Sequence, residues 1–163
     1  MKEIVINSKK HGQKVALVDD SDYEWLNQYR WVIKKSCNVY YAQRNVISHK
    51  KTQFMHRLIL GLTDFNIKCD HRDRNGLNNQ RSNLRTATNS QNLANRAGRK
   101  NSTSKYLGVS WHTKRRKWIA QMRKDGVSIY IGEYKNEKEA ASAYNKKALE
   151  LHKEFAFLND LNL

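Results

Sequence analysis

The stretch CDHRDRNGLNNQRSNLR, residues 69–85, decides how the middle of this chain folds. It sets a carboxylate, Asp70, beside a histidine, His71, and continues through a turn-rich segment to Asn83, with a further amide at Asn92. A carboxylate and an amide oxygen are ligands that Mg²⁺ accepts, and histidine has an intrinsic pKa close to neutrality. The pattern therefore predicts one metal ion and one general base acting on a phosphate.

The local structure around this stretch follows from its turn residues. Residues 67–71 read as a strand, the pair Asn75-Gly76 is a strong turn signal, and a return strand or irregular segment begins near Ser82. Residues 88–95 read as a short helix. Adjacent side chains of a strand face opposite sides, so Asp70 and His71 can share a site only if the strand ends or bends there. The spacing alone is also compatible with ordinary turn residues that have no catalytic role, because asparagine-rich stretches are common in turns.

The residues before this stretch predict a small antiparallel sheet. Apolar runs at 4–6 and 15–18 flank a turn and read as a hairpin, the acidic segment 19–22 supplies N-cap chemistry for a helix at 23–27, and two more strands are expected at 31–33 and 39–42. Residues 54–60 read as a helix with one apolar side. His56 lies off that apolar side, which leaves it either as an ordinary helix histidine or as a group pointing at the site.

After residue 96 the composition changes. Residues 97–104 are small, polar and basic and read as a linker. Three strands are then expected at 106–112, 117–124 and 127–134, followed by a helix with Asn136 as its N-cap. We expect an α+β chain with a β-rich N-terminal part at 1–53, a catalytic module at 54–96, the linker at 97–104 and a second domain at 105–163.

The charge points to a polyanionic partner. The chain has 163 residues and a formal net charge of +16, and both halves are basic. Nucleic acid is the commonest partner of such a protein, with an affinity that falls as salt rises, although scattered surface lysines give the same total.

Other classes of protein are disfavoured. Cys37 and Cys69 lie far apart and form no CxxC pair, which argues against a cysteine-ligated zinc site and a disulfide framework. No apolar run is long enough to cross a bilayer, and the N-terminus lacks a signal-peptide pattern. A soluble intracellular protein is expected, with no membrane, no evident protein partner and a monomeric state.

Residues 54–96 closely resemble the HNH homing endonuclease family of phages and mobile elements. The resemblance lies in Met55-His56-Arg57-Leu58-Ile59-Leu60, Cys69-Asp70-His71, Asn78 to Arg85 and Gln91-Asn92. It implies a ββα-metal fold in which His71 is the general base and Asn83 holds the loop. Asp70 and Asn92 would bind one Mg²⁺ or Mn²⁺ ion, which makes this a His-Asn-Asn variant. By the same resemblance the protein would work in the cytoplasm of a bacterial or phage-infected host cell.

Residues 104–159 resemble a second family, the APETALA/ethylene-response-factor (AP-two) DNA-binding domain. The resemblance lies in Tyr106-Leu107-Gly108-Val109, Lys117 to Arg123, Tyr130 to Tyr134, Glu139 to Tyr144 and Leu158-Asn159. It implies a three-stranded antiparallel sheet laid in the major groove and backed by one helix. Plant members carry arginines where this chain has Leu107, Ser110 and Ser128, so the plant target site does not transfer.

Strand alternation and the two resemblances together give a set of expected DNA contacts. Trp118, Ala120 and Met122 would face the helix, and the alternate residues would face outward. Gln121 suits adenine and Arg123 suits guanine, whereas Lys114, Arg115 and Arg116 suit phosphates. The full set is His56, Arg57, Arg72, Arg74, Arg81, Arg85, His112, Lys114, Arg115, Arg116, Lys117, Gln121, Arg123 and Tyr130.

The sequence therefore predicts a site-specific DNA endonuclease, a homing endonuclease by resemblance, that hydrolyses phosphodiester bonds in double-stranded DNA with one divalent metal ion. A DNA-binding regulator without catalysis is the main alternative, and an RNA-binding or RNA-processing protein is a second one.

Overall fold

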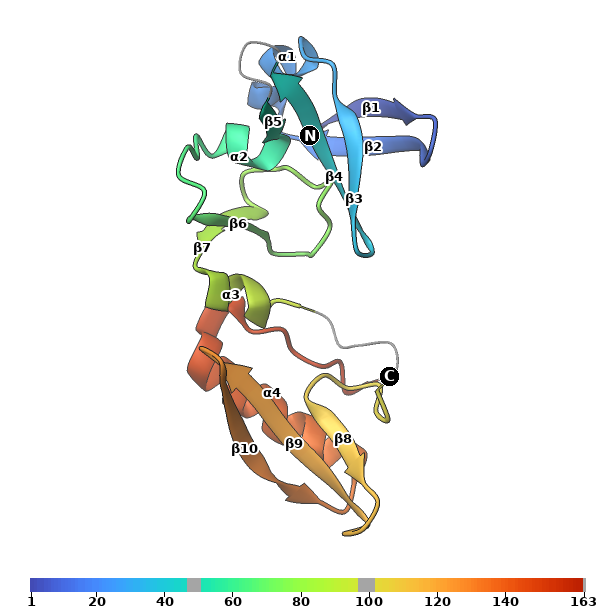
Figure 1. The fold of residues 1–163 in the computed structure, drawn as a ribbon, viewed down its shortest axis with the longest axis vertical. Coiled ribbons are helices and arrows are strands. Elements are labelled where there is room, and N and C mark those ends of the chain that lie inside the picture. The colour runs from blue at the N-terminus through green and yellow to red at the C-terminus, as the bar shows by residue number, and fades with distance from the viewer. Residues whose placement is uncertain (47–50, 97–101, 163) are drawn as a thin grey trace. The chain divides into compact units, whose positions relative to one another are not determined.

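The computed structural model describes residues 1–46, 51–96 and 102–162, which form two compact units, Met1–Thr88 and Asn89–Leu163. Both units combine small antiparallel sheets with helices, which agrees with the expected α+β class (Figure 1).

The first unit begins with a hairpin and a three-stranded sheet. Strands β1 (Lys2–Ser8) and β2 (Gly12–Val18) pair antiparallel, and α1 (Asp20–Asn27) follows. The sheet has the order β3-β4-β5, made of β3 (Val32–Ser36), β4 (Val39–Val46) and β5 (Lys51–Phe54). Strand β5 was not expected from the sequence. It ends directly at α2 (Met55–Ile59), so it sets the position of that helix.

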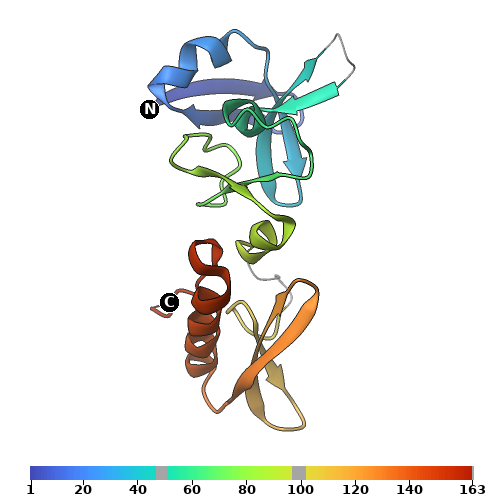
Figure 2. The same ribbon diagram turned by 90° about the vertical axis from the view of Figure 1, so that its left-hand side faces the viewer.

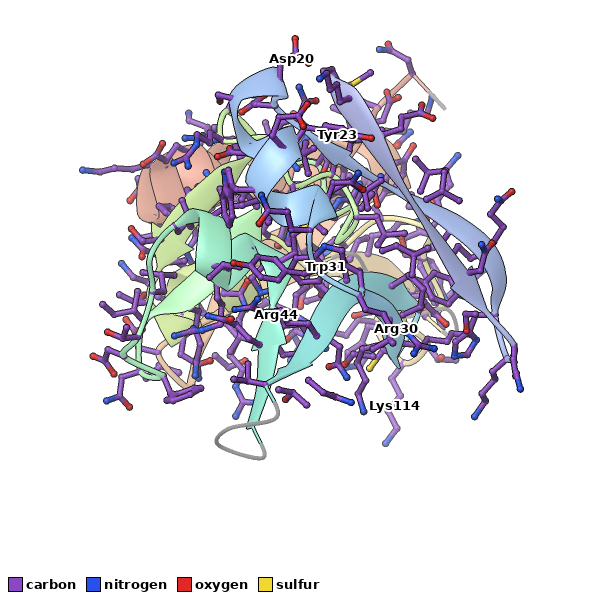
Figure 3. All side chains as sticks on the ribbon, turned by 90° about the horizontal axis from the view of Figure 1, so that it is seen from above. Asp20, Tyr23, Arg30, Trp31, Arg44 and Lys114 are labelled. Carbon is purple, nitrogen blue, oxygen red and sulfur yellow. The ribbon has the colours of Figure 1, made fainter. Side chains whose placement is uncertain are left out.

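One apolar core joins these elements. It contains Ile4 and Ile6 from β1, Ala16 and Val18 from β2, and Leu26 from α1, together with Trp31, Ala42, Met55, Ile59, Leu77 and Leu84. The indole nitrogen of Trp31 donates a hydrogen bond of 2.8 Å to the carbonyl of Leu26, so the one polar atom of this buried ring is satisfied. Figure 3 labels Trp31, together with Tyr23 on α1 and Arg44 on β4.

A second hairpin completes the first unit. Strands β6 (Lys68–His71) and β7 (Leu84–Ala87) pair antiparallel, with Asp70 opposite Arg85 and His71 opposite Leu84. The segment between them docks on β2, because the amide of Leu17 donates to Leu77 at 2.8 Å and the amide of Asn79 donates to Leu17 at 2.7 Å. The loop after His71 is therefore part of the folded unit.

The second unit contains α3 (Asn89–Ala94), the sheet β10-β9-β8, and α4 (Glu137–His152) with a short 3-10 helix, η2 (Lys153–Phe155). Its strands are β8 (Val109–His112), β9 (Lys117–Lys124) and β10 (Val127–Tyr134). Helix α4 lies along one face of this sheet (Figures 1 and 2). Ala120 on β9 packs there against Ala140 and Ala141.

Small residues allow this close packing. A Cβ atom on Gly108, whose φ is +75°, would lie 2.2 Å from the ring of Tyr144 on α4. The alanines on the side of α4 that faces the sheet also let the helix approach the sheet closely. The N-cap prediction also holds here, since Asn136 accepts a hydrogen bond of 2.7 Å from the amide of Lys138.

The structure differs from two sequence-based expectations, one about the N-cap of α1 and one about the linker. Asp19 stands at the N-cap of α1, but its side chain makes no capping bond and instead accepts from the amide of Arg81 at 2.8 Å. Of the expected linker at 97–104, residues 97–101 lie outside the described residues. Ser104 is buried, and its hydroxyl donates to Glu137 at 2.6 Å, so the second unit includes the end of that segment.

Candidate active site

The end of β6 brings Asp70 and His71 to the start of a tight loop. Both residues are 5% exposed. The strand ends at His71, whose carbonyl accepts from the amide of Arg74 at 2.9 Å, and Arg74 has a positive φ of 63°. The turn follows His71, so both residues still pair with β7, and the sharing of one site by Asp70 and His71 stays a prediction.

Aromatic rings surround His71. The ring of His56 on α2 meets it edge-on, with 5.1 Å between centroids and 88° between planes, and Tyr41 on β4 lies at 5.9 Å. Burial lowers the pKa of His71, against the opposing effects of the Asn79 contact and of the carboxylates of Asp73 and Asp70. A neutral imidazole at physiological pH is the form that can accept a proton.

Asn79 contacts one ring nitrogen of His71. Its amide nitrogen donates to the carbonyl of Leu77 at 3.2 Å, so its oxygen faces the imidazole, 3.4 Å from Nε2 of His71. An oxygen acceptor at Nε2 favours the tautomer with its hydrogen there, which makes Nδ1 the basic nitrogen. Asn79 is fully buried. Sequence reasoning treated it as a turn residue or a phosphate contact, and only its place in the docked loop shows the contact with His71.

His56 points toward the site. It is 8% exposed, it stacks on Phe54 with 5.2 Å between centroids, and its Nδ1 has no hydrogen-bond partner among the described residues. Burial lowers the pKa of His56 to about 3, with smaller contributions from His71 and Arg57. Of the two alternatives open for His56, the contact with His71 matches the second, in which the side chain points at the site.

Asn83 ties the two ends of the loop together. Its side-chain oxygen accepts from the amide of Asp73 at 3.1 Å. Its side-chain nitrogen donates to the carboxylate of Asp73 at 2.9 Å and to the carbonyl of Asn78 at 2.8 Å. These bonds hold the loop in one conformation beside His71, whereas a catalytic role for Asn83 stays a prediction.

The carboxylate of Asp70 forms a buried ion pair. Arg85, opposite it in the β6–β7 register, reaches Asp70 through Nε at 2.8 Å and Nη2 at 2.7 Å. Among residues 1–46, 51–96 and 102–162, no three histidine, cysteine, aspartate or glutamate side chains are grouped so that they could hold a metal ion. Magnesium often binds through one or two carboxylates and keeps several waters, so the oxygen chemistry of Asp70 fits it, with Arg85 as the competing cation.

Asn92, the second predicted ligand, lies on α3 and is partly buried. Helix α3 belongs to the second unit, where the carbonyl of Ala94 accepts from the amide of Phe157 at 3.3 Å. The metal-binding role of Asn92 stays a prediction.

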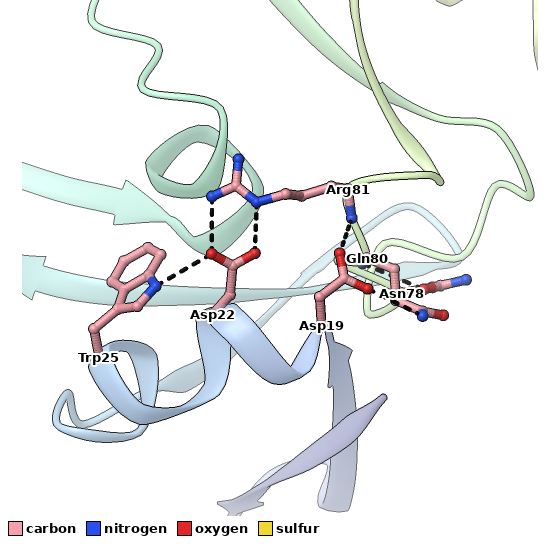
Figure 4. A network of polar contacts seen from close by, with 6 residues as sticks. All are labelled: Asp19, Asp22, Trp25, Asn78, Gln80 and Arg81. Carbon is pink, nitrogen blue, oxygen red and sulfur yellow. Dashed lines mark hydrogen bonds and ion pairs between the residues drawn. The ribbon is translucent and has the colours of Figure 1, made fainter.

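Arg81 joins the loop to α1. Its guanidinium donates to both oxygens of Asp22, each at 2.8 Å, and Trp25 donates to the same carboxylate at 3.2 Å (Figure 4). Asp19 accepts from Gln80 and from the amide of Arg81. Arg81 was predicted to contact DNA, but in this structure its guanidinium is held by a buried carboxylate of the protein.

Three other arginines of the first unit that were predicted to contact DNA, Arg57, Arg72 and Arg74, lie in different surroundings. Arg57 donates to the carbonyls of Ile67, Leu62 and Asp64 and so braces the loop before β6. Arg72 and Arg74 are exposed on the loop after His71.

The sheet of the second unit presents a polar outer face. Directly paired residues share a face, so Tyr130 lies beside Gln121, Ser128 beside Arg123, and His112 beside Lys117. On the other face Ala120 and Met122 are buried, as alternation predicts, whereas Gln121 and Arg123 are exposed. The other predicted contacts there, Lys114, Arg115 and Arg116, are exposed in the turn before β9, and Arg115 forms an ion pair with Glu133.

Comparison with known proteins identifies the family. An uncharacterized HNH endonuclease of Acanthamoeba polyphaga mimivirus is 32% identical to this chain over 148 residues, which make up 90% of this chain and 75% of the relative. The chain belongs to the HNH endonuclease family. No family model matches it, and no solved structure matches it. Within the described part of this HNH family member, no helix is long and apolar enough to cross a membrane.

Sequence reasoning did not predict the contacts that three residues make at the candidate site: Asn79, Tyr41 and, as a packing residue, Gly76. A Cβ atom on Gly76 would lie 2.5 Å from the carbonyl oxygen of Tyr40 and 2.6 Å from the ring of Tyr41. Glycine therefore lets the loop rest against β4. The Asn75-Gly76 turn signal located the turn but gave no hint of this close approach.

Proposed function

We propose that this HNH family member is a DNA endonuclease that hydrolyses phosphodiester bonds with His71 as general base. The observation that carries the proposal is the buried His71 imidazole, whose Nε2 faces the oxygen of Asn79 and whose pKa is lowered by burial. A neutral histidine held in one tautomer suits proton transfer from an attacking water.

In the proposed step, Nδ1 of His71 takes a proton from water as the water oxygen forms a bond to phosphorus. The phosphorus–oxygen bond to the leaving group breaks, and the leaving oxygen takes a proton from solvent. Asn79 and the edge of His56 keep the imidazole in place during this transfer. A divalent ion at Asp70, with Asn92 as the proposed second ligand, would neutralise charge on the phosphate and on the leaving oxygen.

The test is a nicking assay on supercoiled plasmid DNA with Mg²⁺ or Mn²⁺. We expect wild type to cut in a metal-dependent way and His71→Ala to lose most of the activity, since general base catalysis contributes about 10²- to 10⁴-fold. Asn66→Ala, an exposed substitution in the loop before β6, serves as the matched control. Equal rates for wild type and His71→Ala would refute the nuclease proposal and favour a non-catalytic DNA-binding regulator.

We assign target recognition to the outer face of the second unit, in the manner of an AP-two domain. The exposed pair Gln121 and Arg123 on β9 supports this, because these side chains can read adenine and guanine in the major groove. Arg123 also donates to the carbonyl of Gly126 at 3.1 Å, which orients its guanidinium. A ββα-metal module and a site-specific, homing-type activity complete the proposal.

A selection of cleaved sequences from a random duplex library tests this assignment. Arg123→Ala should relax the selected sequence at one or two base positions, whereas Lys138→Ala, an exposed residue of α4, should leave it unchanged. Identical selected sequences for wild type and Arg123→Ala would contradict recognition through this face.

A further inference from the structure

Two lysines and a histidine converge on one tyrosine in the first unit. Nζ of Lys14 lies 5.2 Å from the ring centroid of Tyr40, and Nζ of Lys35 lies 5.3 Å from it. The ring of His11 meets Tyr40 edge-on at 5.5 Å. These side chains come from β2, β3, β4 and the turn before β2; Lys35 is paired with Tyr40 across β3 and β4, whereas Lys14 and His11 belong to the separate β1–β2 hairpin.

The cluster has cations without counter-charges. Among the described residues, no carboxylate forms an ion pair with Lys14 or Lys35. Both ammonium groups contact the same ring, so they lie at most about 10.5 Å apart, a separation comparable with the Debye length of about 8 to 10 Å at 0.15 to 0.1 M salt. Two like charges held this close repel each other, and an anion between them would relieve that repulsion.

A similar pair elsewhere in the unit shows the contrast. Lys2 lies 4.6 Å above the ring of Tyr23, which Figure 3 labels on α1, but Glu24 accepts a hydrogen bond of 3.1 Å from its ammonium group. The charge of Lys2 is therefore paired with a carboxylate of the protein itself. The cluster at Tyr40 keeps its charge available for a ligand.

The cluster adjoins the loop that follows His71. The carbonyl oxygen of Tyr40 lies where Gly76 lacks a Cβ atom, so the loop rests on β4 at this residue. The next residue, Tyr41, contacts His71. Neighbouring side chains of a strand face opposite sides, so Tyr40 and Tyr41 point to opposite faces of β4. The phosphates that border a DNA groove lie about 6 to 12 Å apart, so different phosphates of one duplex can reach the two faces.

We propose that Lys14, Lys35 and Tyr40 form a subsite for the phosphate backbone of double-stranded DNA, next to the catalytic loop. The lysines contact phosphates that flank the cleaved bond, and the tyrosine ring holds both ammonium groups in place through cation–π contacts. The position of the subsite relative to cleavage rests on the proposed nuclease function, but DNA binding at the subsite does not.

Fluorescence anisotropy with a labelled 40-base-pair duplex, full-length protein and EDTA tests the subsite across a series of KCl concentrations. Lys14→Gln and Lys35→Gln should each weaken binding several-fold at low salt and reduce the slope of log affinity against log salt by about 0.9, the value for one lost phosphate contact. The double variant should reduce the slope by about twice as much. Tyr40→Phe should bind like wild type, because it keeps the ring.

Lys2→Gln is the matched control, since it removes a lysine that also lies over a tyrosine ring but has a carboxylate partner. If Lys2→Gln changes affinity and slope as much as Lys35→Gln does, the effect is one of total charge and the subsite is refuted. Thermal unfolding of every variant checks the fold. The outcome is independent of catalysis, because loss of nicking in His71→Ala tests the nuclease proposal without reference to these lysines.

Discussion

Arg85 donates two charge-assisted hydrogen bonds to the carboxylate of Asp70, and both side chains are buried. This pair occupies the carboxylate that is proposed to bind the metal ion. Removing one partner of a buried ion pair leaves an uncompensated charge and typically costs about 3 to 5 kcal/mol. The competition between Arg85 and a divalent ion for Asp70 can therefore be measured through stability.

We expect Arg85→Met to lower the free energy of unfolding by about 3 kcal/mol in EDTA, because Asp70 loses its cation. Excess Mg²⁺ should then restore part of that loss, since an ion that binds only the folded state stabilises it. Urea unfolding with and without Mg²⁺ measures both effects. Wild type and the double variant Asp70→Asn, Arg85→Met should gain less from Mg²⁺. An equal gain in all three proteins would show that the ion binds elsewhere.

Asn79→Ala should reduce the turnover number at least tenfold, because a correctly placed general base contributes about 10²- to 10⁴-fold and this change removes the contact that sets the His71 tautomer. The Michaelis constant should change little, since Asn79 is fully buried. Initial nicking rates over a range of DNA concentrations separate the two parameters. Asn66→Ala is again the control. A full turnover number in Asn79→Ala would exclude a positioning role for this residue.

The contrast between Asn79 and His71 shows what the sequence alone could predict. The end of a strand at His71 and the turn at Asn75-Gly76 follow from local residue types, and both were predicted. The contact of Asn79 with His71 depends on hydrogen bonds between the loop and Leu17, which lies far away in the sequence. Local patterns carry no information about such a docking.

The same reasoning explains the other differences. Asp19 has good N-cap chemistry, but the amide of Arg81 reaches its carboxylate from a distant loop. The segment Lys51-Thr52-Gln53 is polar and lacks alternation, so only its pairing with β4 makes it a strand. The role of Arg85 depends on the strand register, which places it opposite Asp70. In each case a partner distant in the sequence decides what the residue does.

Stability should fall between pH 7 and pH 5 because of His56. The pKa of this residue is about 3 in the folded protein and about 6.5 in an unfolded chain. A lowered folded-state pKa means that the unfolded state binds more protons, so this stabilisation is present above pH 6.5 and is lost as pH falls toward 3. The expected loss at pH 5 is about 2 kcal/mol. His71 contributes with the same sign.

His56→Phe tests this prediction, because phenylalanine keeps a ring that can stack on Phe54 but cannot take up a proton. Urea unfolding at pH 7, 6 and 5 should give a flatter dependence for this variant than for wild type. Carboxylates elsewhere titrate equally in both proteins and cancel in the difference. Parallel curves would show that His56 does not titrate in this range.

Arg81→Ala should act on stability rather than on DNA affinity. The guanidinium donates to both oxygens of Asp22, whose side chain is 3% exposed, whereas the Arg81 side chain is 52% exposed. Solvent screens a half-exposed pair, so we expect a loss of about 1 kcal/mol, seen as a lower midpoint in thermal unfolding. The salt slope of DNA binding should stay at the wild-type value, because Asp22 rather than a phosphate holds this cation. Arg72→Ala, at an exposed arginine of the same loop, provides the comparison. A fall of the slope by about one unit in Arg81→Ala would instead assign Arg81 to a phosphate and require Asp22 to release it on binding.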